Sequence, residues 1–249
     1  MKTILKVNEL SKTYELAQVI NRISFEVHEG EFVAIMGPSG SGKSTLLYNI
    51  SGMDRPTSGE VELNGQSISE LPDAEISEVR LKRMGFIFQH SYLLKNLSIR
   101  DNIALPGFKA GVLTREQVNQ DTDTLLQKTG ITDIAAQDIK KVSGGQLQRA
   151  AICRALINRP DILFCDEPTG ALNSSTTREV MDIINAVNDD GMTIIMVTHD
   201  MRVASRASRI IYLIDGAIKD ELVLGKYEAK DSQTAREKRL ADWLENQGF

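Results

Sequence analysis

The chain has few cysteines for its length, only Cys153 and Cys165 among 249 residues. Both lie in apolar segments, and two such thiols do not form the disulfide framework of a small secreted domain. A chain of this length also buries enough apolar surface to fold without cross-links. We therefore expect a protein of a reducing compartment.

The sequence also lacks a long apolar run. A helix that crosses a bilayer needs about 20 consecutive apolar residues. The most apolar stretches here, Ile162–Cys165, Thr193–Val197 and Ile210–Ile214, have only the length of a strand. The first residues reach a lysine too early for a signal peptide. We expect an intracellular chain, which a partner must bring to a membrane if it works there.

Basic residues are in the minority. Lysine and arginine number 29 against 34 aspartate and glutamate, which gives a formal net charge of −5. Sequence-independent affinity for nucleic acid comes from lysine and arginine at phosphates. An acidic chain is therefore a poor candidate for such a binder, and we expect no nucleic-acid partner.

Strand-like and helix-like patterns divide the chain into parts. Residues 1–35 contain runs of branched residues broken by turns, and residues 98–157 show helical periodicity only. Strands and helices alternate again after Pro160, which predicts a parallel sheet covered on both faces. The sequence therefore predicts an α/β fold with a helical insert at about residues 90–158.

The last 25 residues, 225–249, form a tail of mixed charge. Leu240, Trp243 and Leu244 follow the i, i+3, i+4 spacing of one helix face. We expect a short helix with one apolar side. It would either be a solvated end or clamp onto another part of the chain or a partner.

A glycine-rich segment joins a strand-like run to a helix-like run. Glycines there let successive backbone N–H groups face phosphate oxygens, and the helix N-terminus adds positive potential. We expect Lys43 to reach the terminal phosphates and Ser44 to hold Mg²⁺. A turn without a ligand is the alternative for the bare pattern. The candidate residues are Gly37, Pro38, Ser39, Gly40, Ser41, Gly42, Lys43, Ser44 and Thr45.

Two adjacent acids, Asp166 and Glu167, end the apolar run Ile162–Cys165. Carboxylates at the C-terminal end of a parallel strand face the crevice where ligands bind such sheets. We expect Asp166 to hold Mg²⁺ through water and Glu167 to activate the water that attacks a γ-phosphate. Taken alone, two acids more often begin a solvated loop, and the glycine-rich segment upstream favours the catalytic interpretation.

Four further features fit the same chemistry. Ser143-Gly144-Gly145-Gln146 precedes a helical run and makes a second anion-binding turn in one chain. Gln89 ends a strand, where its amide would ligate Mg²⁺. His199 follows another strand, where its imidazole would hydrogen-bond a γ-phosphate. Tyr14 would stack on a base. Taken singly, each is more typical of a structural or solvated residue.

In this order, the motifs resemble those of the nucleotide-binding subunit of an ATP-binding-cassette (ABC) transporter, over about residues 5–216. The resemblance implies a P-loop NTPase cassette. Such a cassette has a RecA-like, mostly parallel sheet core, an antiparallel β subdomain and an inserted α-helical subdomain. It would occupy residues 1–224. The family's elements are the adenine-stacking aromatic Tyr14, the Walker A loop 37–45, the Q-loop residue Gln89, the signature loop Ser143–Gln146, the Walker B residue Asp166, the catalytic Glu167 and the switch His199.

The same resemblance implies an ATPase with Mg²⁺ as cofactor and two partners. One is a second, identical ATP-binding subunit in a head-to-tail dimer, whose signature loop closes over the ATP of the first. The other is an integral membrane permease, which holds the subunit at the cytoplasmic face of the membrane.

The finer resemblance is to macrolide-export and lipoprotein-release ATPases, and most of all to bacitracin-export ATPases of antimicrobial peptide resistance. It rests on the strings Asp166–Leu172 and Ile195–Asp200. The chain departs from the family at Val142, where leucine is usual, and at Asn173, where aspartate is usual. Asparagine keeps the shape but loses the charge, which leaves open a regulatory or scaffolding ATP-binding module with little transport.

Overall fold

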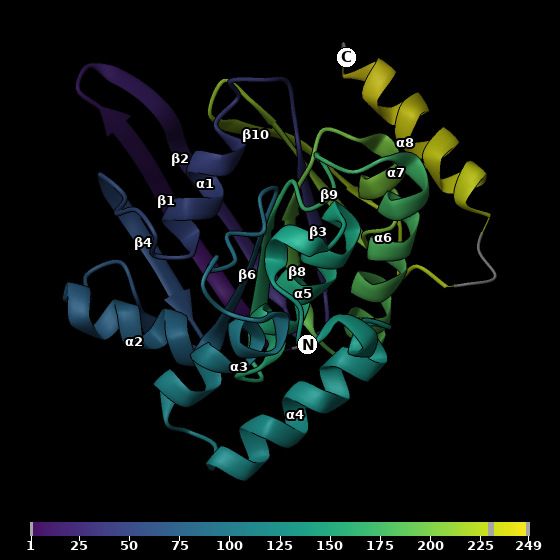
Figure 1. Ribbon diagram of the computed structural model, residues 1–249. Coiled ribbons are helices and arrows are strands. Elements are labelled where there is room, and N and C mark those ends of the chain that lie inside the picture. The colour runs from purple at the N-terminus through teal and green to yellow at the C-terminus, as the bar shows by residue number, and fades with distance from the viewer. Residues whose placement is uncertain (1, 229–231, 248–249) are drawn as a thin grey trace. The chain divides into compact units, whose positions relative to one another are not determined.

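The computed structural model describes residues 2–228 and 232–247. The chain falls into two compact units, one formed by residues up to Leu71 with those from Val187 on, the other by Pro72–Ala186. Figure 1 labels their helices and strands. We describe each unit by itself.

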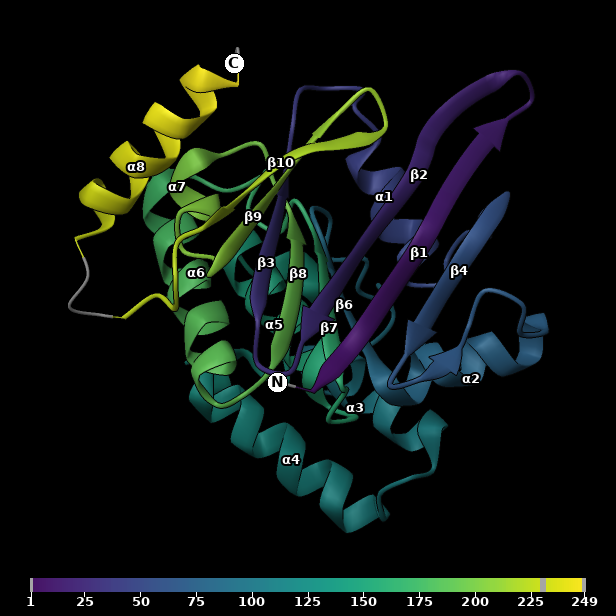
Figure 2. The same ribbon diagram turned by 180° about the vertical axis from the view of Figure 1, so that it is seen from behind.

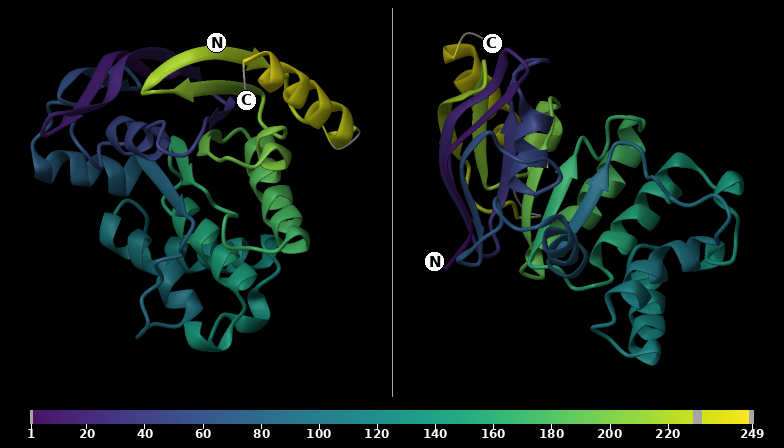
Figure 3. Two further views of the ribbon diagram at one scale, coloured as in Figure 1. Left: turned by 90° about the horizontal axis from the view of Figure 1, so that it is seen from above. Right: turned by 90° about the vertical axis from the view of Figure 1, so that its left-hand side faces the viewer.

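The first unit contains an antiparallel sheet with the strand order β2-β1-β4-β5. Its strands are β1 (Thr3–Tyr14), β2 (Ala17–His28), β4 (Ser58–Leu63) and β5 (Gln66–Ser67). The register of β1 on β2 shifts at several points. Such irregularities bend a strand pair, and the long β1–β2 pair curves visibly (Figure 3).

The first unit also contains the parallel strands. β3 (Phe32–Met36) lies between β8 (Thr193–Val197) and β9 (Arg209–Ile214), parallel to both, and β10 (Ala217–Val223) returns antiparallel to β9. Every residue of β3 and β8 is buried, as expected for strands covered on both faces. Helix α1 (Lys43–Ile50) follows β3, and the short α7 (Met201–Ala204) follows β8 (Figure 2).

The second unit pairs β6 (Met84–Phe88) in parallel with β7 (Ile162–Asp166). Its helices are α2 (Asp73–Arg83), α3 (Ile99–Ala110), α4 (Arg115–Lys128), α5 (Gly144–Leu156) and α6 (Ser174–Asp189), with 3₁₀ turns at Thr132–Ile134 and Ile139–Lys141. The last residues of α6 pass into the first unit.

Helices α3, α4 and α5 share one apolar core. Ile103 from α3, Val118 from α4 and Ala150 from α5 are completely buried in it. No named strand lies between β6 and β7 in the described chain, so the segment expected to be helical contains helices and turns. The predicted limits of the insert, about 90–158, stay a prediction.

The tail forms helix α8 (Gln233–Asn246) in the first unit. Its buried stripe is Leu240 and Leu244. Trp243 lies edge-on to Tyr212 of β9, and its indole N–H donates to Asp220 of β10. The Arg236 guanidinium donates to backbone carbonyls of the first unit, including those of Ser205 and Gly225. The tail is therefore clamped onto its own unit.

Among the described residues, no helix is both long enough and apolar enough to cross a membrane. Cys153 and Cys165 are both buried free thiols.

The packing of α8 makes a stability prediction. Leu240→Ala removes a fully buried side chain and should lower the free energy of unfolding by about 2–4 kcal/mol, because a cavity remains. Leu16→Ala is the matched control, since Leu16 is 99% exposed. Urea unfolding of the two variants measures the difference; equal stabilities would show that α8 does not hold its seat.

Candidate functional site

The glycine-rich loop connects β3 to α1 in the first unit. Gly37, Gly40 and Gly42 have φ values of +155°, +81° and +95°, which favour glycine. A Cβ atom at Gly37 would lie 2.1 Å from the carbonyl oxygen of Leu213, and one at Gly42 would lie 2.8 Å from Ile20 Cδ1. The neighbouring strands β9 and β2 therefore leave room only for bare backbone.

The loop concentrates positive charge. The Lys43 side chain folds over it, and its ammonium donates to the carbonyl oxygens of Gly37 (2.9 Å) and Pro38 (2.8 Å). The first turn of α1 contains no acidic residue, so nothing in it offsets the positive end of the helix dipole. The Ser41 hydroxyl is buried without a hydrogen-bond partner among the described residues. Ammonium, helix N-terminus and spare hydroxyl together fit a polyphosphate.

His199 lies at the same end of the sheet as this loop. Ile35 of β3 pairs with Val197 of β8, and the N–H of Thr198 donates to the carbonyl of Ile35. His199 thus leaves β8 where the chain leaves β3 for the loop. His199 is exposed, and its hydrogen bond to a γ-phosphate stays a prediction.

Tyr14 ends β1 in the same unit, and the residue is 46% exposed. Its hydroxyl donates to Asp54, which follows α1. The structure therefore connects Tyr14 to the helix that begins at the glycine-rich loop. Sequence analysis did not identify Asp54, because its role depends on a contact between residues 40 positions apart.

In the second unit, parallel pairing brings Gln89 and Glu167 together. Phe88 pairs with Asp166, so the residues that follow leave the strands side by side. A Cβ atom on Gly170 would lie 3.0 Å from Gln89 Nε2 and 3.2 Å from Glu167 Oε2. Both side chains therefore converge on the bare face of Gly170, whose importance no sequence signal showed.

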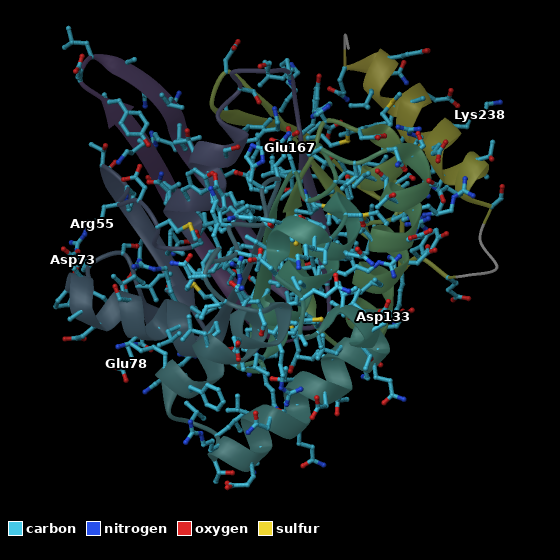
Figure 4. All side chains as sticks on the ribbon, in the orientation of Figure 1. Arg55, Asp73, Glu78, Asp133, Glu167 and Lys238 are labelled. Atoms are coloured by element: carbon cyan, nitrogen blue, oxygen red, sulfur yellow. The ribbon has the colours of Figure 1, made fainter. Side chains whose placement is uncertain are left out.

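Glu167 itself, labelled in Figure 4, has a φ of +46°. Such a value is uncommon for a residue with a side chain and is typical of functional turns. The N–H of Gly170 donates to the Glu167 carbonyl and closes this turn. Glu167 thus begins this turn directly after Asp166, the last residue of β7.

The segment Ser143–Gln146 begins α5 with a capping box. The Ser143 hydroxyl accepts from the Gln146 N–H, and the Gln146 side-chain oxygen accepts from the Ser143 N–H. The N–H groups of Gly144 and Gly145 have no acceptor within an α-helix at these positions. A Cβ atom at Gly145 would lie 2.4 Å from Thr176 Cγ2, so the approach of α6 requires glycine there.

Two amide side chains position these elements. Gln148 of α5 is buried and donates to the carbonyl of Phe88, which fixes α5 to the end of β6. Asn173 precedes α6, and its side-chain oxygen accepts from the Thr176 N–H and the Ser175 hydroxyl. Asparagine thus caps α6 without the charge that aspartate would add.

The predicted site residues divide between the units. Tyr14, residues 37–45 and His199 gather in the first, while Gln89, Ser143–Gln146, Asp166 and Glu167 belong to the second. No group of three or more histidine, cysteine or acidic side chains forms a metal cage in the described parts of the chain.

Comparisons with known proteins show what the chain is similar to. The family model described as ABC transporter matches residues 20–170. The chain is 42% identical over 235 residues to the lipoprotein-releasing system ATP-binding protein LolD of Leptospira interrogans, covering 93% of this chain and 97% of that one. It is 43% identical over 219 residues to the macrolide export ATP-binding/permease protein MacB of Campylobacter fetus, covering 86% of this chain but 34% of MacB.

A solved structure supports the fold. The dimeric, post-hydrolysis structure of the ATP-binding cassette MJ0796 with ADP and Pi superposes with a TM-score of 0.82 at 37% identity, covering 90% of this chain and 100% of that one. The match confirms the predicted fold class.

Gly170→Ala tests the convergence of Gln89 and Glu167. The new methyl group must push both side chains by a few tenths of an ångström, and Gly170 is not among the residues of positive φ. We expect kcat for ATP hydrolysis to fall about tenfold while KM stays within about twofold, because small displacements of catalytic groups are costly. Steady-state kinetics measures this, and an unchanged kcat in the folded variant would contradict it.

Proposed function

The chain belongs to the ABC transporter family as an ATP-hydrolysing, ATP-binding subunit of the LolD/MacB type, and on this premise we propose that it drives a separate membrane permease. It acts as a head-to-tail homodimer at the cytoplasmic face of the membrane. Its transport function is antimicrobial peptide resistance, of the bacitracin-export kind.

The observation that carries the proposal is the phosphate cradle at Gly37–Thr45. Lys43, now on the carbonyls of its own loop, turns to the β- and γ-phosphates. Ser44, Gln89 and Asp166 supply hydroxyl, amide and carboxylate oxygens, the hard ligands that Mg²⁺ prefers. These side chains would hold Mg²⁺ together with phosphate oxygens and water, and the ion would supply positive charge next to the phosphates.

When ATP is bound, it supplies the γ-phosphoryl group that water attacks. Glu167 orients that water and accepts its proton, and its turn geometry with Gln89 beside it supports this role. His199 donates a hydrogen bond to the γ-phosphate edge from the end of β8. Tyr14 stacks on the base.

Two anion-binding helix starts in one chain support the dimer. α1 begins at the phosphate cradle and α5 at Ser143–Gln146, and the two lie in different compact units. In a head-to-tail pair, α5 of the second copy faces the ATP held by the first. The relative with ADP and Pi is described as dimeric, which also supports pairing.

Exposed apolar side chains of the second unit support docking of a permease. They lie on α3 and on the segments that flank it: Tyr92, Leu94, Leu105, Phe108 and Val112. Tyr92 also lies edge-on to Phe88, the residue before Gln89. A permease helix on this surface would therefore transmit movement through Tyr92 and Phe88 to Gln89, the proposed Mg²⁺ ligand.

Phe108→Glu tests this docking surface. It should reduce co-isolation of a polytopic membrane protein with the subunit at least severalfold, since a charge replaces half-exposed apolar contact area. The matched control is Leu16→Glu, on a fully exposed turn of the first unit. Quantitative mass spectrometry of complexes from membranes measures both. Equal recovery would contradict docking at α3.

The antimicrobial peptide assignment rests on the strings Asp166–Leu172 and Ile195–Asp200. Its test is the bacitracin sensitivity of cells with and without the subunit, and unchanged sensitivity would contradict the substrate class.

Asn173 favours a second candidate function, a regulatory ATP-binding module, because its cap on α6 carries no charge. Hydrolysis near background in the complete membrane complex would support that candidate.

Glu167→Gln tests the catalytic assignment. Glutamine keeps the shape but cannot accept the proton, so turnover should fall by more than about 100-fold while ATP binding persists. The ATP-bound dimer should then accumulate in size-exclusion chromatography. Lys43→Ala is the contrasting variant and should lose both nucleotide affinity and the dimer. Wild-type hydrolysis in Glu167→Gln would remove Glu167 from the role proposed here.

A further inference from the structure

Lys12 and Asp54 form a charged cluster that contacts Tyr14, outside the phosphate cradle. The Tyr14 hydroxyl donates to Asp54 Oδ2 at 2.5 Å. The Lys12 ammonium lies 2.8 Å from Asp54 Oδ1 and 2.6 Å from the carbonyl oxygen of Arg55. Lys12 is only 9% exposed, while the Asp54 side chain is 32% exposed, so the lysine side of the ion pair is shielded from water and the carboxylate side is partly open.

Asp54 is itself fixed to helix α1. The N–H groups of Met53 and Asp54 both donate to the carbonyl of Tyr48, in the last turn of α1. The other end of α1 is the phosphate cradle at Lys43. An eight-residue helix is about 12 Å long, so one rigid element connects the anchor of Tyr14 with the phosphate-binding end.

The cluster also decides which face of the ring is open. The Lys12 ammonium lies over the ring at 4.6 Å from its centroid, which occupies one face with a cation–π contact. Tyr14 as a whole is nevertheless 46% exposed. A flat ligand can therefore stack on the face opposite Lys12. The lysine charge makes the electrostatic potential of that opposite face less negative, which favours stacking of an electron-rich purine.

We propose that Asp54, braced by Lys12, is a positioning residue that holds the Tyr14 ring as a one-sided platform for the purine base of ATP. This inference rests on the proposed function, since it concerns the base of the same nucleotide. Because Asp54 follows one end of α1 and Lys43 begins the other, α1 sets the distance between the base site and the phosphate site. Asp54 acts through Tyr14 and touches no phosphate.

The hydroxyl of Tyr14 carries a measurable sign of this arrangement. The hydrogen bond to Asp54, with burial and the negative charge of Asp54, raises the pKa of Tyr14 to about 12, while the Thr45 hydroxyl acts in the opposite direction. The phenol therefore stays a hydrogen-bond donor throughout the neutral range. Removing the carboxylate charge should bring its pKa back toward 10.

The experiment compares two ligands on three variants of the full chain. Isothermal titration with Mg²⁺-ATP and with inorganic tripolyphosphate separates base from phosphate binding. Asp54→Asn should weaken ATP about tenfold, as expected for a lost charge-assisted hydrogen bond, and change tripolyphosphate by less than about twofold. Tyr14→Phe keeps the ring but loses the tether, and should resemble Asp54→Asn.

The matched control is Glu62→Gln. Glu62 pairs with Lys6 at 3.9 Å on the same antiparallel sheet, so it removes a similar ion pair of β1 that does not contact Tyr14. It should bind both ligands like the wild type. Difference absorbance of tyrosinate, with Tyr14→Phe as the blank, should show a lower Tyr14 pKa in Asp54→Asn only.

Four outcomes would overturn the inference. Unchanged ATP affinity in Asp54→Asn and Tyr14→Phe would show that the ring needs no tether. Equal losses for ATP and tripolyphosphate would show that Asp54 supports the cradle and not the base. A wild-type chain that binds tripolyphosphate but gains nothing from the base would remove the platform itself. A wild-type chain that binds neither ligand would contradict the proposed function, and the inference with it.

Discussion

The glycine-rich loop between β3 and α1, which we propose as a phosphate cradle, is the constraint on which the rest of the structure depends. The loop needs φ values that side chains resist, at Gly37, Gly40 and Gly42. It also needs close walls, and the carbonyl of Leu213 and the side chain of Ile20 stand where Cβ atoms of Gly37 and Gly42 would be. The strands β2, β3 and β9 thus shape the loop before any ligand arrives, which reduces the entropy lost on binding.

Parallel strand pairing then brings chemistry to strand ends within each unit. The pairs Ile35–Val197 and Phe88–Asp166 are in register, so the residues that follow them leave the sheet together. His199 comes to the edge that holds the cradle, and Glu167 comes beside Gln89. In a parallel sheet, ligands bind at the C-terminal ends of the strands, so polar site residues directly follow buried, mostly apolar strands.

The sequence predicted those features that depend on local spacing. The glycine-rich loop, the acids after β7, the start of α5 and the helix at Leu240–Leu244 each depend on residues that are close together in the sequence. Asp54, Lys12, Gln148 and Gly170 were missed because each acts through a partner distant in sequence. The bond of Trp243 to Asp220 was likewise invisible, since an apolar spacing says nothing of an indole N–H partner.

The most direct test of the central claim is an NMR titration of glycine-labelled protein with ATP. We expect the amide signals of Gly37, Gly40 and Gly42 to shift strongly, because their N–H groups would face the phosphates, while those of Gly65 and Gly225 stay in place. Adenosine should not reproduce the shifts. Unmoved signals for the three loop glycines at saturating ATP would contradict the account.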